Sequence, residues 1–90
     1  MQERVILTVR GRTQGVFFRH STRIHAVQLG LTGTAENLVD GSLSVILEGE
    51  RAKIDEFITW AKSGPPLARV DEITITWEQP TGQFSRFQIL

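Results

Sequence analysis

The stretch Gly11–Arg19, "GRTQGVFFR", combines two glycines, an apolar run and one permanent positive charge. We interpret it as a turn from a strand into a helix, which leaves about four backbone N–H groups without intrahelical partners. With the helix dipole, these groups form a site for an anion. Gly15 lacks a Cβ, so the main chain can curl around a tetrahedral group. Arg19 adds a fork that grips phosphate oxygens. The stretch therefore predicts a phosphate pocket.

The same residues also allow a purely structural interpretation, in which Gly11 and Gly15 only form a turn and Arg19 is a solvated helix residue. Other phosphate-binding motifs are absent, since the chain contains neither the P-loop pattern nor the dinucleotide-binding glycine pattern. Cysteine is absent as well, which removes thiolate nucleophiles and disulfides. Water is the attacking group that remains.

Two histidines and one asparagine are further candidates for chemistry. His20 and His25 have no third histidine or cysteine with which to complete a metal site, so we expect no metal and interpret both as partly exposed helix residues. Asn37 precedes the Asp40-Gly41 turn, and its amide can donate to and accept from one water molecule at once. In isolation, Asn37 is also compatible with an ordinary polar residue at a strand end.

Hydrophobic periodicity predicts the elements that must position these residues. Phe18, Thr22, Ala26 and Leu29 share the core face of the first helix, whereas Ile24 and Val27 point away from it, to the rim of the core or to an exposed apolar spot. The predicted elements of the first half are a strand over 4–11 ended by Gly11, a helix over 18–29 stopped by Gly30, and strands over 31–39 and 42–48 joined by Asp40-Gly41. A second helix is predicted between Gly49 and Gly64, and its core face consists of Ile54, Phe57, Ile58 and Ala61. It is followed by a strand over 69–78, with Ile73, Ile75 and Trp77 on one face, and by a short strand within 84–90.

This order, βαββαβ with a short extra C-terminal strand, predicts an α+β fold of the ferredoxin-like class. Strands that alternate apolar and polar residues suit an antiparallel sheet covered by two helices on one face. Ninety residues form one domain, so we assign 1–90 to a single unit.

The charge balance bears on the partners of the protein. Ten basic and ten acidic side chains cancel, so we expect no binding to nucleic acid or to a membrane. Residues 1–25 nevertheless hold five arginines against the single acid Glu3, which places the basic end where an anion would bind. No stretch approaches the ~18 consecutive apolar residues of a transmembrane helix, and the N-terminus does not have the pattern of a signal peptide. We therefore expect a cytoplasmic monomer.

Two separate motifs carry a resemblance to a known family. "GRTQGVFFR" is close to G-R-V-Q-G-V-x-F-R, and "AVQLGLTGTAENLVDGSLSVILEG" is close to A-x-x-L-G-L-x-G-x-V-x-N-x-x-D-G-x-V-x-x-x-x-x-G, while "SGPPLARVDEI" also fits. In these motifs and their spacing the chain resembles the acylphosphatases, whose fold is the same ferredoxin-like sandwich. Thr13 and Ala35 replace valines of the family pattern, and Ile24 and Val27 stand where polar residues are common.

The resemblance implies a function and a set of site residues. Arg19 matches the family's phosphate-binding arginine, and Asn37 matches the asparagine that orients the attacking water. The phosphate cradle would be the backbone of Gln14, Gly15, Val16, Phe17 and Phe18. The implied reaction is hydrolysis of the carboxyl-phosphate bond of an acyl phosphate by direct attack of water, without metal or cofactor, in a site that also accepts phosphate or sulfate. The alternative is a non-catalytic phosphate or small-ligand binding module of the same fold. RNA binding is disfavoured because the central strands lack aromatic residues.

Overall fold

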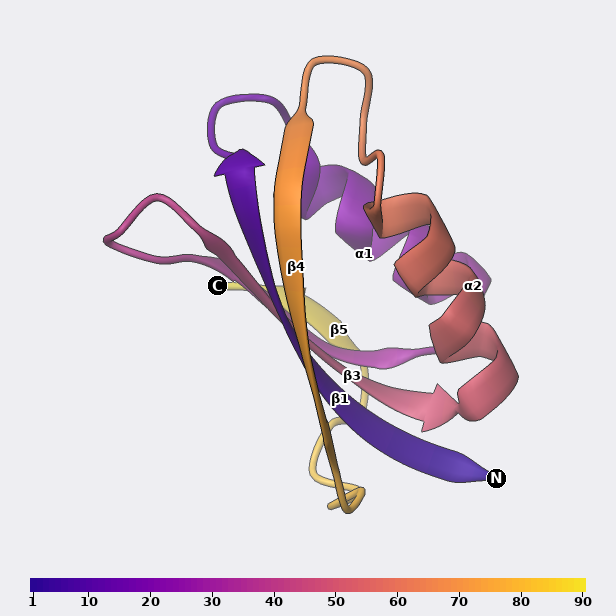
Figure 1. Cartoon of the computed structure of the whole chain (residues 1–90). Coiled ribbons are helices and arrows are strands. Elements are labelled where there is room, and N and C mark those ends of the chain that lie inside the picture. Colours follow the sequence, from indigo (N-terminus) through magenta and orange to yellow (C-terminus); the bar gives the residue numbers. More distant parts are fainter.

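The computed structural model describes residues 1–90 and shows one sheet with two helices packed against one of its faces (Figure 1). The elements are β1 (Gln2–Arg12), α1 (Phe18–Gln28), β2 (Thr32–Asn37), β3 (Leu43–Glu50), α2 (Arg51–Ala61), β4 (Arg69–Glu78) and β5 (Phe87–Ile89). Their number, type and order confirm the predicted α+β, ferredoxin-like fold. Neither helix has the length and apolar character needed to span a membrane.

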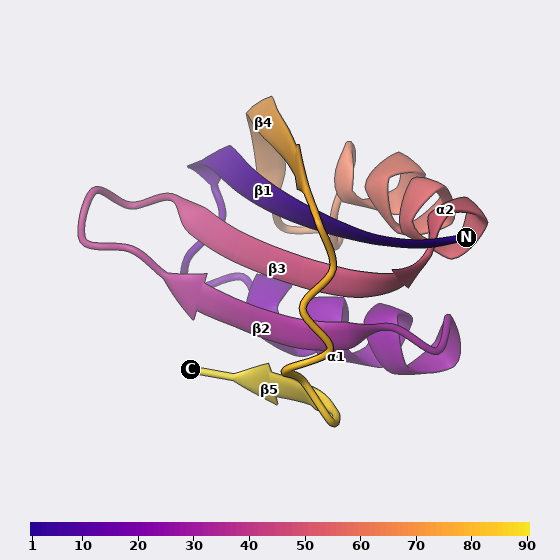
Figure 2. The same cartoon turned by 90° about the horizontal axis from the view of Figure 1, so that it is seen from below.

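The sheet has the strand order β4-β1-β3-β2-β5. β1 pairs antiparallel with both β3 and β4, and β2 pairs antiparallel with β3, as predicted for the four main strands. The extra strand β5 instead joins β2 in parallel, so the complete sheet is mixed. The reason is the path of the chain: after β4 it crosses the face of the sheet opposite the helices and reaches the other edge (Figure 2).

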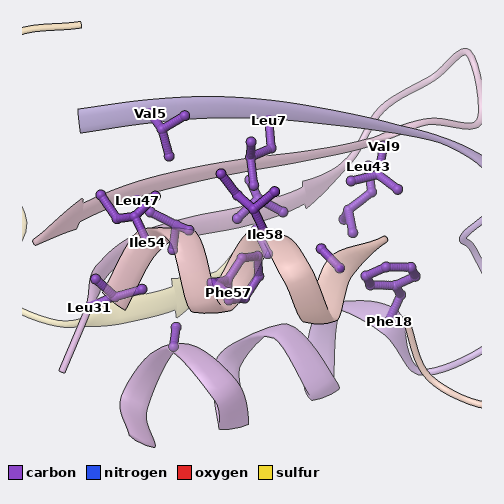
Figure 3. Close-up of a cluster of buried hydrophobic side chains, with 14 of the residues drawn as sticks. Val5, Leu7, Val9, Phe18, Leu31, Leu43, Leu47, Ile54, Phe57 and Ile58 are labelled. Atoms are coloured by element: carbon purple, nitrogen blue, oxygen red, sulfur yellow. The ribbon is translucent and has the colours of Figure 1, made fainter. Parts of the chain in front are cut away.

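The core lies between the sheet and the helices (Figure 3). Val5, Leu7 and Val9 alternate along β1 and are fully buried, because the strand turns every second side chain toward the helices. The predicted core face of α2, from Ile54 to Ala61, is confirmed, and Phe18 of α1 is also buried. This packing fixes the start of α1 relative to the end of the sheet.

Two predictions of local structure need correction. Gly11 does not end β1; the strand continues to Arg12 through an irregularity at Arg10/Gly11. Gly11 is needed there because a Cβ would clash with the carbonyl oxygen of Arg69. The apolar face of β4 is less buried than its alternation suggests, with Ile75 41% and Trp77 37% exposed. β4 is an edge strand, and the helices cover the centre of the sheet more fully than its edge.

Ile24 and Val27 of α1 lie outside the core, as their position on the helix predicted. Their side chains are 45% and 62% exposed, which decides between the two alternatives in favour of an exposed apolar spot.

Candidate active site

A cavity of about 310 Å³ lies where the loop after β1 meets the ends of β2 and β5. Its wall consists of Thr13, Gly15, Phe17, Phe18, Arg19, His20, Asn37 and Ile89. Arg19 and Asn37, which come from different motifs of the sequence, thus face the same space. The wall contains no acidic side chain, and this favours an anionic ligand.

The loop between β1 and α1 presents unpaired amides. Gly15 and Phe17 both adopt left-handed backbone conformations, with φ of 74° and 63°, and Phe17 caps the N-terminus of α1. The backbone N–H groups of residues 14–20 donate no hydrogen bond of normal geometry within the protein. Free N–H groups at a helix start create a positive potential, so the loop has the properties of an anion site.

Side-chain hydrogen bonds hold this loop against the turn between β2 and β3. The Thr13 hydroxyl donates to the carbonyl oxygen of Gly41 at 3.1 Å. The Gln14 amide nitrogen donates to the carbonyl oxygens of Leu38 at 3.0 Å and Ser42 at 3.3 Å. Because Asn37 directly precedes this turn, the same bonds fix the loop amides relative to Asn37.

The turn itself is stabilised by Asp40. Its Oδ1 atom accepts hydrogen bonds from the backbone N–H of Ser42 at 2.9 Å and from the Ser42 hydroxyl at 2.6 Å. These bonds to Ser42 hold the pKa of the Asp40 carboxyl below its usual value. Gly41 follows with φ of 94°, a conformation suited to glycine. The Asp40-Gly41 pair therefore forms the predicted turn.

Asn37 is the last residue of β2 and pairs with Leu43. Its side-chain oxygen, Oδ1, is buried and has no hydrogen-bond partner. Nearly all buried polar atoms in proteins are hydrogen-bonded, so an orphan of this kind requires an explanation. Its position in the cavity wall suits an acceptor for a bound water molecule.

Arg19 lies in the first turn of α1, and its guanidinium is anchored at one corner. Nη1 donates to the carbonyl oxygen of Leu90 at 3.0 Å, while the backbone N–H of Leu90 donates to Ala35 at 2.9 Å. β5 and the residue after it therefore connect β2 to the arginine. The remaining guanidinium donors form no hydrogen bond within the protein, and Arg19 forms no ion pair. They are free to bind an anion.

The structure separates the predicted cradle residues into two groups. Gly15, Phe17 and Phe18 line the cavity, but Gln14 and Val16 do not. The Gln14 side chain turns to the β2–β3 connection, and Val16 is buried in the core, so these residues can contribute only their main chain to the cavity.

Sequence reasoning missed three residues of the wall, namely Thr13, His20 and Ile89. His20, interpreted as a partly exposed helix residue, is exposed as expected but also borders the cavity. Its place directly after Arg19, at the start of the helix, was a usable signal. The position of Ile89 depends on the parallel pairing of β5 with β2, which no local pattern shows.

Comparisons with known proteins agree on one family. The family model described as Acylphosphatase matches residues 5–89. An acylphosphatase from Pyrobaculum islandicum is 44% identical over 88 residues, covering 97% of this chain and 93% of that protein. One from Pelotomaculum thermopropionicum is 40% identical over 86 residues, covering 96% and 94%. The crystal structure of acylphosphatase from Bacillus subtilis matches with a TM-score of 0.94 and 30% identity, covering 100% of this chain and 99% of that one.

Proposed function

Because this chain belongs to the acylphosphatase family, we propose that its cavity hydrolyses the carboxyl-phosphate bond of acyl phosphates to a carboxylate and inorganic phosphate. The observation that carries the mechanism is the unpartnered, buried Oδ1 atom of Asn37 in the same cavity as the guanidinium of Arg19.

The loop and Arg19 bind the phosphoryl group in this mechanism. The free N–H groups of residues 14–20 and the unbonded guanidinium donors of Arg19 surround its oxygens. In phosphoryl transfer the protein acts chiefly by positioning and by stabilising charge that spreads over these oxygens. The hydrogen bond from Arg19 to Leu90 fixes the guanidinium before substrate arrives, so little reorganisation is needed.

Asn37 orients the attacking water. Its Oδ1 accepts a hydrogen bond from the water, which leaves a lone pair of the water oxygen directed at phosphorus. Attack occurs in line with the bond to the leaving carboxylate. The hydrogen bonds from Gln14 to the β2–β3 turn maintain the distance between this water and the loop.

The leaving group explains why no general acid is required. The expelled group is a carboxylate, whose conjugate acid has a pKa of about 4, as in a glutamate side chain. It departs unprotonated at neutral pH. The water oxygen forms a bond to phosphorus as the bond between phosphorus and the carboxyl oxygen breaks, and both water protons leave on the inorganic phosphate, so one acyl phosphate and one water molecule are consumed and no redox partner is needed.

Two substitutions test this proposal with benzoyl phosphate as the substrate. Arg19→Ala should lower kcat/KM by about 100-fold or more, because one preorganised donor commonly contributes about 3 kcal/mol to the transition state. Asn37→Ala should lower kcat by a similar factor but retain phosphate binding in calorimetry, since its role is to hold water. Arg23→Ala is the matched control, because Arg23 lies one turn further along α1 and outside the cavity wall.

The results also distinguish the non-catalytic alternative. A wild-type protein that binds phosphate but does not hydrolyse benzoyl phosphate would be a binding module of the same fold. Wild-type turnover that survives in both Arg19→Ala and Asn37→Ala would place the reaction elsewhere on the molecule.

A further inference from the structure

Phe17 has an unusual combination of backbone conformation and exposure. Every other positive-φ position in the chain is a glycine, whereas Phe17 adopts φ of 63° and ψ of 26° with a bulky side chain. This conformation is strained for such a residue and free of strain for glycine. The ring is 75% exposed, so burial in the core does not offset the strain. Strained residues of this kind occur at functional sites, where the side chain is retained for a purpose.

The cavity beside this ring is larger than the reacting group. Water occupies about 30 Å³ per molecule in the liquid, so about 310 Å³ corresponds to roughly ten water molecules. A phosphoryl group and the attacking water together contain far fewer non-hydrogen atoms than that. Most of the volume is therefore available to the acyl group of the substrate.

The wall of this remaining space offers apolar surface. Its apolar members are Phe17, Phe18 and Ile89, and Phe18 is only 1% exposed, so its ring belongs to the core. Phe17 provides an exposed aromatic ring in the wall and lies two residues before Arg19 in the sequence. The phosphoryl group already explains the two electrostatic features of the wall, namely its single guanidinium and its lack of acidic side chains.

Resting on the proposed function, we infer that Phe17 forms a subsite for the acyl group and gives the enzyme a preference for aromatic or bulky apolar acyl phosphates over acetyl phosphate. In-line attack directs the leaving carboxylate away from the water held by Asn37. The acyl group then lies at the mouth of the cavity and packs against the exposed ring. Aromatic groups gain stabilisation from this contact beyond the area that they bury.

The test compares benzoyl phosphate with acetyl phosphate in two variants, Phe17→Gly and Phe17→Asn. Glycine and asparagine both tolerate the left-handed conformation, so the loop keeps its backbone while the ring is lost. The ratio of kcat/KM for benzoyl phosphate to that for acetyl phosphate should fall about tenfold in both variants, mainly through the KM of benzoyl phosphate. Val27→Ala is the matched control, because Val27 is also an exposed apolar residue of α1 and lies about 15 Å along the helix.

A binding measurement complements the kinetics. Benzoylphosphonate and acetylphosphonate carry a carbon-phosphorus bond that the reaction cannot hydrolyse, so calorimetry reports their affinities directly. The wild type should bind benzoylphosphonate more tightly, and both Phe17 variants should reduce this difference.

The possible failures are distinguishable. An unchanged substrate ratio in Phe17→Gly and Phe17→Asn, with active wild type, overturns the acyl subsite and leaves the proposed function intact. An equal loss for both substrates in both variants means that the ring only orders the loop. A wild type that hydrolyses neither substrate but binds both phosphonates contradicts the proposed function, and the phosphonate affinities then still decide whether Phe17 contacts the acyl group.

Discussion

At the scale of single residues, the site consists of polar groups that the protein itself leaves without partners. The Asn37 oxygen is buried without a hydrogen bond, and the Arg19 guanidinium is held at one corner while its other donors are free. Leaving a buried acceptor unsatisfied costs about 1–3 kcal/mol. The position of this oxygen in the cavity wall suits a bound water molecule that would satisfy it.

The local pattern of residues 11–19 already indicated Arg19 as a phosphate-binding group, whereas the role of Asn37 in orienting water came from the resemblance. Taken alone, an arginine at a helix start and an asparagine near a turn are common surface residues. What the pattern could not show is that the two motifs face one cavity, because this depends on how α1 packs against β2. The left-handed conformation of Phe17 was equally hidden, since phenylalanine gives no local signal for it.

The pH dependence of turnover is a prediction at this scale. His20 is the one histidine in the cavity wall. No step of the proposed mechanism uses it, so kcat should be nearly constant from about pH 5 to 7. Steady-state kinetics of the wild type and of His20→Asn across this range provide the measurement. A sigmoidal change that disappears in His20→Asn would give His20 a catalytic role.

At the scale of elements, the site depends on the junction between one loop and one hairpin. Asp40-Gly41 predicted the hairpin correctly, and Gly15 marked the point where the loop adopts positive φ. The hydrogen bonds from Thr13 and Gln14 to the hairpin could not be predicted, because they require the folded distance between segments remote in sequence. Thr13, a departure from the family's valine, supplies one of these bonds through its hydroxyl.

Substitution of Gly15 tests whether the curl of the loop is needed for binding phosphate. Gly15 has φ of 74°, and a Cβ added there would meet no other atom within 4 Å, so Gly15→Ala introduces conformational strain without a clash. We expect a loss of about 1 kcal/mol in the free energy of unfolding and a weaker affinity for inorganic phosphate. Thermal unfolding and calorimetry measure the two effects.

Gly30→Ala is the matched control for this prediction. Gly30 has φ of 72°, equally open surroundings, and a position at the far end of α1. Its substitution should cost similar stability but leave phosphate affinity unchanged. If both variants bind phosphate as the wild type does, the conformation of Gly15 is not what shapes the anion site.

At the scale of the whole molecule, the segment after β4 ties the two edges of the sheet together (Figure 2). The Glu48 carboxylate on β3 accepts hydrogen bonds from the backbone N–H and hydroxyl of Thr81 and from the N–H of Gly82. Arg4 on β1 donates to the same carboxylate at 2.7 Å. The segment leads directly to β5, which brings Leu90 to Arg19. The buried ion pair between Arg4 and Glu48 thus holds the segment that leads to β5, a strand at the border of the cavity. It does so from the face of the sheet opposite the helices.

The order of the predicted elements was enough to predict the fold, but it did not predict the crossing segment between β4 and β5 or its contacts with Glu48. Arg4 and Glu48 alternate with apolar residues in their strands, so each was compatible with an ordinary solvated position. Their burial results from the crossing segment, which carries no periodic pattern of its own. The parallel placement of β5 has the same origin.

Acid unfolding should reveal the contribution of Glu48. Burial of its carboxyl opposes ionisation, but hydrogen bonds from Thr81, Arg4 and Gly82 outweigh burial and lower the pKa from 4.5 to about 2. A carboxyl with a lowered folded-state pKa stabilises the fold above its unfolded pKa, and this stability disappears as pH falls through the folded pKa. The free energy of unfolding should therefore decline from about pH 4.5 to about pH 2.

Glu48→Gln provides the comparison for this prediction. At pH 7 it should lower the free energy of unfolding by about 2 kcal/mol, because the buried guanidinium of Arg4 loses a charged partner. Between pH 4.5 and 2 its stability should fall less steeply than that of the wild type, as followed by urea unfolding at each pH. Parallel curves for the two proteins would show that other carboxyls control acid unfolding.

The central position of β1 also has a consequence for how the molecule assembles. Arg4 lies opposite Glu48 of β3 on one side and Glu78 of β4 on the other. The strand β1 can therefore pair only after these later parts of the chain have been made. Distant pairings of this kind slow folding, because the entropy cost of closing the loop must be met before the contacts form. At synthesis rates of about 5–20 residues per second, several seconds separate the emergence of β1 and β4 from the ribosome. Throughout that interval the apolar side chains of Val5, Leu7 and Val9 lack the completed sheet, and the nascent chain depends on staying unaggregated until its last long strand is made.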